Sequence, residues 1–238
     1  MADPINNPAT DVPEQEPEAQ GGGSKYLRPD ELLRKFSVSL TNARADAGIL
    51  NTMSRFLYDD KRISEGIAMH AKVAELFAKQ RKEYGEQLDA SSALENTFNK
   101  AAAAYMETLK ISRIAFEGDT NAIAALLLSG PRSKVLSVWI KQADTFYRNL
   151  LPNADFMKKM GFYGYTGDKL KNEQKMVQDV MAADAKHKKE KGESQEATKV
   201  RDNALADLET WMSKFYRIAT IACAGQQQWL EKLGIKQA

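Results

Sequence analysis

The chain contains an internal repeat. Residues 53–118 align with residues 160–225 at a constant shift of 107 without a gap, and 16 of the 66 pairs are identical. Self-similarity over this length constrains the architecture more strongly than a local motif does, because each copy has to build the same kind of packing unit. The sequence therefore predicts two pseudo-equivalent units within 238 residues.

Apolar residues recur at spacings of three and four throughout both copies, which is typical of amphipathic helices. In the first copy one such stripe runs from Leu32 to Leu57, a second from Ile63 to Phe77 and a third from Leu94 to Ala115. No stretch shows the persistent alternation of a strand. We predict an all-α fold of two tandem three-helix units, forming a six-helix bundle with a short connecting helix.

The expected organisation has four segments. Residues 1–27 form a disordered acidic, proline-rich tail with a glycine-rich hinge, and residues 28–118 form the first helical repeat. Residues 119–132 are a connector helix and turn. Residues 133–238 form the second repeat, and its apolar end, Trp229–Ile235, is expected to dock on that repeat because exposing it would be costly.

Glycines and a proline mark the expected helix ends. Gly85 and Gly192 are equivalent and each follows a Lys-Glu pair closely, so we expect both to close a helix with positive φ. Pro152 is expected to break the first helix of the second copy. The glycine-rich string 161–167 lacks the lysine of a phosphate-binding loop and is interpreted as an interhelical turn with an aromatic plug.

The last helix of the second copy has the clearest buried face. We expect its core positions to be Leu205, Leu208, Met212, Phe215, Ile218 and Ala222. Trp211 lies opposite Ala104 in the repeat, so the two copies differ in bulk there. The favoured interpretation is repacking of the core, and a small-molecule pocket is the alternative.

Charge is distributed unevenly along the chain. Residues 1–24 hold five acidic residues and no Lys or Arg, a charge of −5, so the rest of the chain carries +7. Because both signs are evenly mixed in the body, this balance disfavours a nucleic-acid-binding surface. The tail is expected to be flexible, and docking on a partner or a neighbouring subunit is the alternative.

Cys223 is the single cysteine, so no internal disulfide is expected and its apolar neighbours predict a buried thiol. The N-terminus lacks the pattern of a signal peptide. The longest apolar run, residues 122–128, is far shorter than the ~20 residues of a membrane span. We therefore expect a cytoplasmic protein without membrane insertion.

The sequence contains no set of residues with the types and spacing of a catalytic or metal site. Asp184 and His187 have the i, i+3 spacing at which two ligands can share a metal, but the first copy has Phe77 and Gln80 there and lysines surround the pair. His70, the other histidine, is not preserved in the repeat. The basic run 186–191 is interpreted as a solvated helix end. We predict no catalytic residue, no metal site and no cofactor.

The second copy contains a specific set of motifs: Gly164-Tyr165-Thr166, Lys191-Gly192-Glu193-Ser194-Gln195-Glu196-Ala197-Thr198, Arg201-Asp202-Asn203-Ala204, Leu208, Trp211-Met212, Phe215, Ile218-Ala219, Ile221-Ala222 and Leu230-Glu231-Lys232-Leu233-Gly234-Ile235. As a set they resemble an uncharacterised bacterial family of internally duplicated all-helical proteins. The likeness covers about residues 160–235 and is looser over the first copy. The resemblance implies a bacterial origin and a helical fold, and it carries no active-site residue.

Duplicated amphipathic units without a chemical site favour an interaction role. We expect a non-enzymatic structural or scaffold protein that acts through protein contacts on helix faces, with a self-assembling subunit as one form of that role. Its partners would be proteins, either other copies or other subunits, and small molecules stay open. The competing hypothesis is a ligand-binding or enzymatic helical bundle that uses a cleft between the two repeats.

Overall fold

The computed structural model describes residues 28–235, which form eight α-helices and no strand. The all-α prediction is confirmed, while the tail at residues 1–27 lies outside the described part of the chain. The helices are α1 (Pro29–Ala45), α2 (Ala47–Ser54), α3 (Asp60–Ala115), α4 (Thr120–Ala125), α5 (Leu136–Leu150), α6 (Ala154–Gly161), α7 (Gly167–Ala222) and α8 (Gln227–Lys232).

The duplication extends over nearly all the described residues. Adding 107 to the bounds of α2, α3 and α4 gives those of α6, α7 and α8, and α1 and α5 begin 107 residues apart. Positive φ angles repeat at the same shift, in the pairs Leu57/Gly164, Gly118/Gly225 and Leu127/Gly234. We call residues 29–128 repeat 1 and residues 136–235 repeat 2. Helix α4, expected as a connector, is thus the counterpart of α8.

Gly85 and Gly192 do not end helices, and the prediction of a turn at these positions is wrong. They lie inside α3 and α7, each of 56 residues, and neither has positive φ. A lone glycine costs a helix interior only about 1 kcal/mol relative to alanine. The flanking Lys, Glu and Gln residues are good helix formers, so the middle and last helices expected in each copy are one helix.

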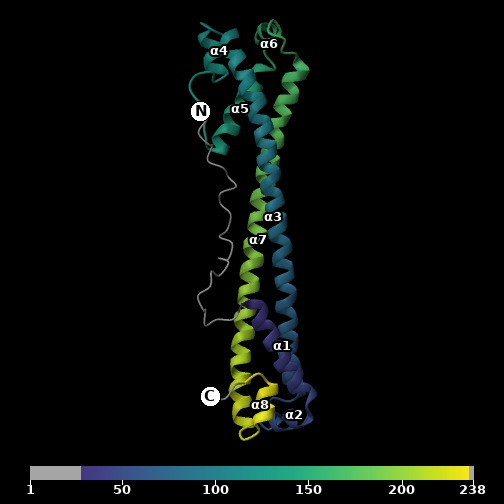
Figure 1. The fold of residues 1–238 in the computed structure, drawn as a ribbon. Helices are drawn as coiled ribbons and strands as arrows, with labels where there is room; N and C mark the ends of the chain where they lie inside the picture. The colour runs from purple at the N-terminus through teal and green to yellow at the C-terminus, as the bar shows by residue number, and fades with distance from the viewer. Residues whose placement is uncertain (1–27, 236–238) are drawn as a thin grey trace. The chain divides into compact units, whose positions relative to one another are not determined.

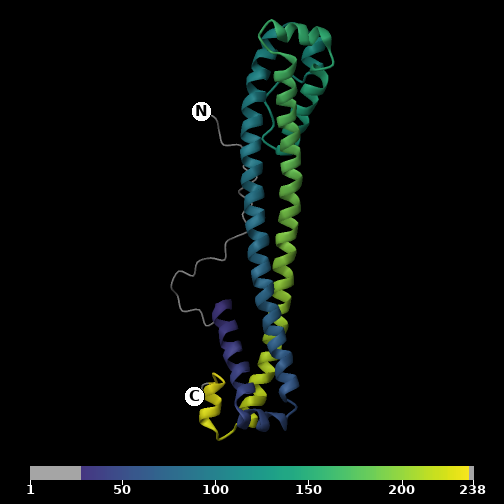
Figure 2. The same cartoon turned by 90° about the vertical axis from the view of Figure 1, so that its right-hand side faces the viewer.

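Two compact units divide the described residues, and they cut across the repeats. The described part of unit 1 is Gly85–Gly192, and that of unit 2 is residues 28–84 with residues 193–235. Each unit contains part of α3, part of α7 and short helices from both repeats (Figure 1, Figure 2). The expected tandem pair of three-helix lobes is therefore not the arrangement found, because each unit draws its helices from both repeats.

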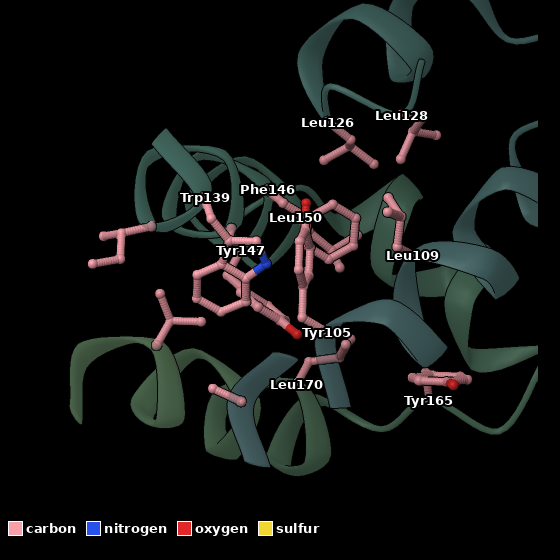
Figure 3. Close-up of a cluster of buried hydrophobic side chains, with 14 of the residues drawn as sticks. Tyr105, Leu109, Leu126, Leu128, Trp139, Phe146, Tyr147, Leu150, Tyr165 and Leu170 are labelled. Atoms are coloured by element: carbon pink, nitrogen blue, oxygen red, sulfur yellow. The ribbon is translucent and has the colours of Figure 1, made fainter. Parts of the chain in front are cut away.

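Unit 1 has an aromatic core. Helices α4, α5 and α6 gather around the C-terminal part of α3 and the N-terminal part of α7 (Figure 1). Tyr105, Phe146 and Tyr147 are fully buried, and the ring centroids of Tyr105 and Phe146 are 5.4 Å apart (Figure 3). Trp139 of α5 meets Phe98 of α3 edge to face at 4.9 Å. Rings from the two repeats therefore interlock in this core.

Unit 2 repeats this plan with α1, α2 and α8 around the N-terminal part of α3 and the C-terminal part of α7. Tyr58, in the loop that precedes α3, packs edge to face on Trp211 and Phe215 of α7. The terminal segment reaches this core through its buried Leu230 and Leu233. Ser39 Oγ of α1 is within hydrogen-bonding distance, 2.8 Å, of the Leu233 carbonyl, which fixes the end of α8.

Equivalent capping residues separate the first two helices of each repeat. Asp46 accepts hydrogen bonds from the backbone N–H groups of Gly48 and Ile49 and starts α2. Asn153 caps α6 in the same way. The break expected at Pro152 is confirmed, and the matching break at Asp46 was missed because the apolar stripe runs on past it. Asp and Asn are both favoured caps, since their side chains satisfy N–H groups that have no helical partner.

Candidate functional site

Glu173 of α7 is a buried carboxylate in unit 1, with only 5% of its surface exposed. One of its oxygens accepts two hydrogen bonds, from Thr108 Oγ1 of α3 at 2.7 Å and from the Tyr147 hydroxyl of α5 at 2.9 Å. Burial, reinforced by the adjacent Glu173, raises the pKa of Tyr147, so this phenol stays protonated and donates. The three side chains join three helices around one oxygen atom.

The equivalent place in unit 2 is apolar. The counterparts of Glu173, Thr108 and Tyr147 there are Gly66, Phe215 and Leu40. A Cβ atom on Gly66 would lie 2.5 Å from the Trp211 ring, so the indole occupies the space beside this glycine. In unit 1 the counterpart of Trp211 is the smaller Ala104. Unit 2 thus has Gly66 with the large ring of Trp211, whereas unit 1 has Glu173 with the small Ala104 at the equivalent positions.

Polar contacts surround the buried group on two sides. Arg132 Nη1 donates to the hydroxyl oxygen of Tyr105 at 3.0 Å. Burial raises the pKa of Tyr105, and Arg132 opposes that rise. On the other side, the Tyr165 hydroxyl donates to Glu107 at 2.9 Å, and Lys169 Nζ lies 3.3 Å from the same oxygen. The hydrogen bond from Tyr165, followed by that from Lys169, lowers the pKa of Glu107.

The buried group is closed to reactants. Thr108 and Tyr147 are both fully buried. A general acid or base has to come within hydrogen-bonding reach of its substrate, directly or through one water molecule. In this structure the hydroxyl groups and the Glu173 oxygen are engaged with one another instead. The arrangement favours a structural role, in which a satisfied polar group fixes the packing of α3, α5 and α7.

His70 and Asp184, two of the positions considered from sequence, make ordinary contacts. His70 Nε2 lies 3.0 Å from the Leu33 carbonyl oxygen, within hydrogen-bonding distance, and this contact joins α3 to α1. Asp184 accepts a hydrogen bond from Lys188 at 2.7 Å, so its carboxylate is paired with a cation one helical turn away. The structure therefore gives the Asp184 and His187 spacing no added support as a metal site.

Two interpretations of local segments need correction. The basic run 186–191 lies in the interior of α7 and not at a helix end. In the string 161–167, Phe162 is 79% exposed, so it does not plug the turn. Only Tyr165 turns inward, where it is buried and binds Glu107. The interhelical position of the string is confirmed.

The prediction for Cys223 is confirmed. Cys223 is fully buried, and burial raises the pKa of its thiol. The predicted core of the last helix is confirmed at Leu208, Met212 and Phe215, which are buried. The other three predicted positions are half-buried against the same core: Leu205, Ile218 and Ala222. Trp211 and Phe215 stack at 5.7 Å with an interplanar angle of 16°. Trp211 is 7% exposed and belongs to the core of unit 2, which supports the repacking interpretation.

Exposed apolar residues recur at equivalent places in the two repeats. Ile114 of α3 is 57% exposed and Ile221 of α7 is 61% exposed, each one residue before the end of its helix. Phe56 and Tyr163, in the loops that precede α3 and α7, are also exposed. The sequence had shown the Ile114/Ile221 identity, but periodicity alone could not show that both side chains face water.

A shallow hollow in unit 2 is lined by residues of α7 alone, from Ala206 to Arg217. None of the helices within residues 28–235 is long and apolar enough to cross a membrane. No family model, curated protein or solved structure matches the chain.

Proposed function

We propose that the protein is a non-enzymatic scaffold that acts through protein contacts on helix faces. The observation that carries this proposal is the exposed isoleucine at the same position of both repeats, Ile114 in unit 1 and Ile221 in unit 2. Single exposed apolar residues are common on protein surfaces. An exposed isoleucine that both diverged copies retain is a more specific feature, since most equivalent positions differ.

Each isoleucine would contribute binding free energy, because an interface would remove its side chain from water. Complete burial of a fully exposed isoleucine is worth roughly 1.5–3 kcal/mol. Because Ile114 and Ile221 are 57% and 61% exposed, somewhat more than half of that value is available for each. Because the chain carries the position twice, it presents two similar surfaces, and similar surfaces on different copies can pair with one another. Self-association through these helix ends is the form of the proposal that can be tested without knowing another partner.

The competing function has less support. A ligand-binding or enzymatic bundle would use a cleft between the repeats, but the rings of Tyr105, Phe146 and Tyr147 fill the place where the repeats meet in unit 1 (Figure 3). The buried Glu173 is likewise engaged by two hydroxyl donors.

Sedimentation equilibrium over a range of concentrations tests the proposal. We expect the apparent mass of the wild-type chain to rise with concentration and that of the Ile114→Lys/Ile221→Lys variant to stay at the monomer value. Val38→Lys is the matched control, because Val38 is 48% exposed but its counterpart is Thr145. A wild-type mass that does not change with concentration, or equal effects from the control, would contradict the proposal.

A further inference from the structure

The loop from α4 to α5, which leads from repeat 1 into repeat 2 and is called the linker, is held by two arginines. It comprises residues 126–135, between the end of α4 and the start of α5. Arg113 of α3 donates from Nε to the Leu128 carbonyl at 2.7 Å and from Nη2 to the Gly130 carbonyl at 2.5 Å. Arg132 donates from Nη2 to the Leu127 and Ser129 carbonyls at 2.7 and 3.0 Å, besides its bond to Tyr105. We call these contacts the linker clamp.

The clamp ties the linker to repeat 1 as far as Arg132. From the next residue onward the linker belongs to repeat 2, because the Ser133 N–H donates to Gln142 Oε1 of α5 at 3.0 Å. The linker is thus held on repeat 1 up to Arg132 and on repeat 2 from Ser133 onward. The counterpart of Arg113 in repeat 2 is Thr220, so the arginine is found in the repeat whose α4 leads into the linker.

Many of the contacts that hold each unit together join the two repeats. Phe98 on Trp139 and Glu173 with Thr108 join them in unit 1, and Tyr58 on Trp211 joins them in unit 2. Ion pairs do the same: Lys159 with Asp119 at 2.8 Å in unit 1 and Lys232 with Asp46 at 2.7 Å in unit 2. A second copy of the chain can supply an identical repeat and restore all of these contacts in both units.

We propose that two copies of the chain can exchange their second repeats, and that the linker clamp decides whether repeat 1 pairs with repeat 2 of its own chain or of another. Only the linker differs between the two states, so release of the clamp removes the main interaction that favours pairing within one chain. Leu127, held at φ 52 next to the clamp, adds backbone strain that opening the linker can relieve. The exchange involves the linker and the two cores, not the exposed isoleucines.

Zero-length carbodiimide cross-linking of the full chain tests the exchange. The reagent joins a lysine to a carboxylate that it contacts, so it should couple Lys232 to Asp46 and Lys159 to Asp119. Each link joins repeat 1 to repeat 2. In an equal mixture of ¹⁴N and ¹⁵N chains that have been unfolded and refolded together, exchanged dimers give cross-linked peptides of mixed isotope composition. Dimers formed by surface contact give linked peptides from a single chain.

Two variants change the linker and one serves as control. Arg113→Ala/Arg132→Ala removes the clamp. Deletion of residues 131–134 makes the linker too short for repeat 1 to pair with repeat 2 of the same chain. We expect both to form dimers of twice the monomer mass with mixed-isotope cross-links, while the wild type stays cross-linked within one chain. Arg148→Ala, which removes an exposed arginine of α5, should behave as the wild type.

The outcomes separate the exchange of repeats from association through the molecular surface. If the double variant does not fold, the deletion variant decides. Folded monomers with cross-links inside each chain would overturn the proposal, and so would dimers whose cross-linked peptides are never mixed. The second result would leave the surface association proposed above intact. Mixed peptides that persist in the Ile114→Lys/Ile221→Lys background would establish exchange even if the scaffold proposal failed.

Discussion

Alanine substitutions at three glycines should change stability in opposite directions. All three glycines are helical, but the free space around an added Cβ atom differs between them. Gly85 and Gly192 lie inside α3 and α7, and an added Cβ atom would meet nothing within 4 Å. Alanine is favoured over glycine in a helix interior by about 1 kcal/mol. Gly85→Ala and Gly192→Ala should therefore each stabilise the protein by about that amount.

Gly66 is also inside α3, but its Cβ would lie 2.5 and 2.7 Å from two atoms of the Trp211 ring and 3.0 Å from Leu40 Cδ2. Overpacking of this kind costs typically 1–3 kcal/mol. The same helical gain of about 1 kcal/mol offsets part of the cost. Gly66→Ala should therefore lower stability by up to about 2 kcal/mol.

Urea and thermal unfolding followed by far-UV circular dichroism measure these changes. For a chain of this size, 1 kcal/mol corresponds to a Tm shift of roughly 2–4 °C. Where two unfolding transitions are observed, each should be fitted on its own. Destabilisation by Gly85→Ala or Gly192→Ala would mean that the glycines occupy a turn after all. Stabilisation by Gly66→Ala as large as that by Gly85→Ala would refute the close packing of Trp211.

Three further predictions concern single positions. Leu57, 83% exposed at φ 64, takes a conformation that Gly164 takes in repeat 2, so Leu57→Gly should stabilise the protein by about 1 kcal/mol in urea unfolding and Gly164→Leu should do the reverse. Phe215→Ala should cost roughly 3–5 kcal/mol because the ring is fully buried, while the exposed Lys214→Ala should be nearly neutral; similar losses would refute the assigned face. The pKa of Asp46 is lowered mainly by its hydrogen bond from Lys232, and that of Asp119 mainly by the Ala122 N–H together with Lys159. The two ionised carboxylates therefore stabilise the fold at pH values above their ordinary pKa of 3.8. This stabilisation is lost as pH falls through their lower pKa in the folded protein. Tm measured against pH should therefore fall less steeply in acid for Asp46→Asn/Asp119→Asn, whose amides keep the caps, and an unchanged slope would contradict the ion pairs.

The sequence was sufficient to predict what depends on local pattern. The spacing of Leu208, Met212 and Phe215 identified the buried face of α7, and all three are buried. The repeat register predicted matching helices, and the structure extends that register to α4 and α8. Periodicity shows which face of a helix is buried but not which element covers that face. The sharing of each unit between both repeats therefore could not be predicted.

Glu173 was missed for a related reason. It stands between Lys171 and Lys175 in a charged stretch that is typical of a solvated helix face. Thr108 lies within the expected stripe from Leu94 to Ala115, but nothing local indicated its partner. The signal that could have found Glu173 is a pair of compensating differences between the repeats, Gly66 against Glu173 and Ala104 against Trp211. The second difference alone suggested only a change in core bulk.

The central claim is that each unit is built from both repeats, and aromatic NOE measurements on the selectively labelled protein test it most directly. The structure predicts NOEs between Tyr58 and Trp211, whose ring centroids are 5.6 Å apart, and between Phe98 and Trp139, at 4.9 Å. Both pairs join repeat 1 to repeat 2, one in each unit. A folded protein that shows aromatic NOEs only within each repeat would contradict the account.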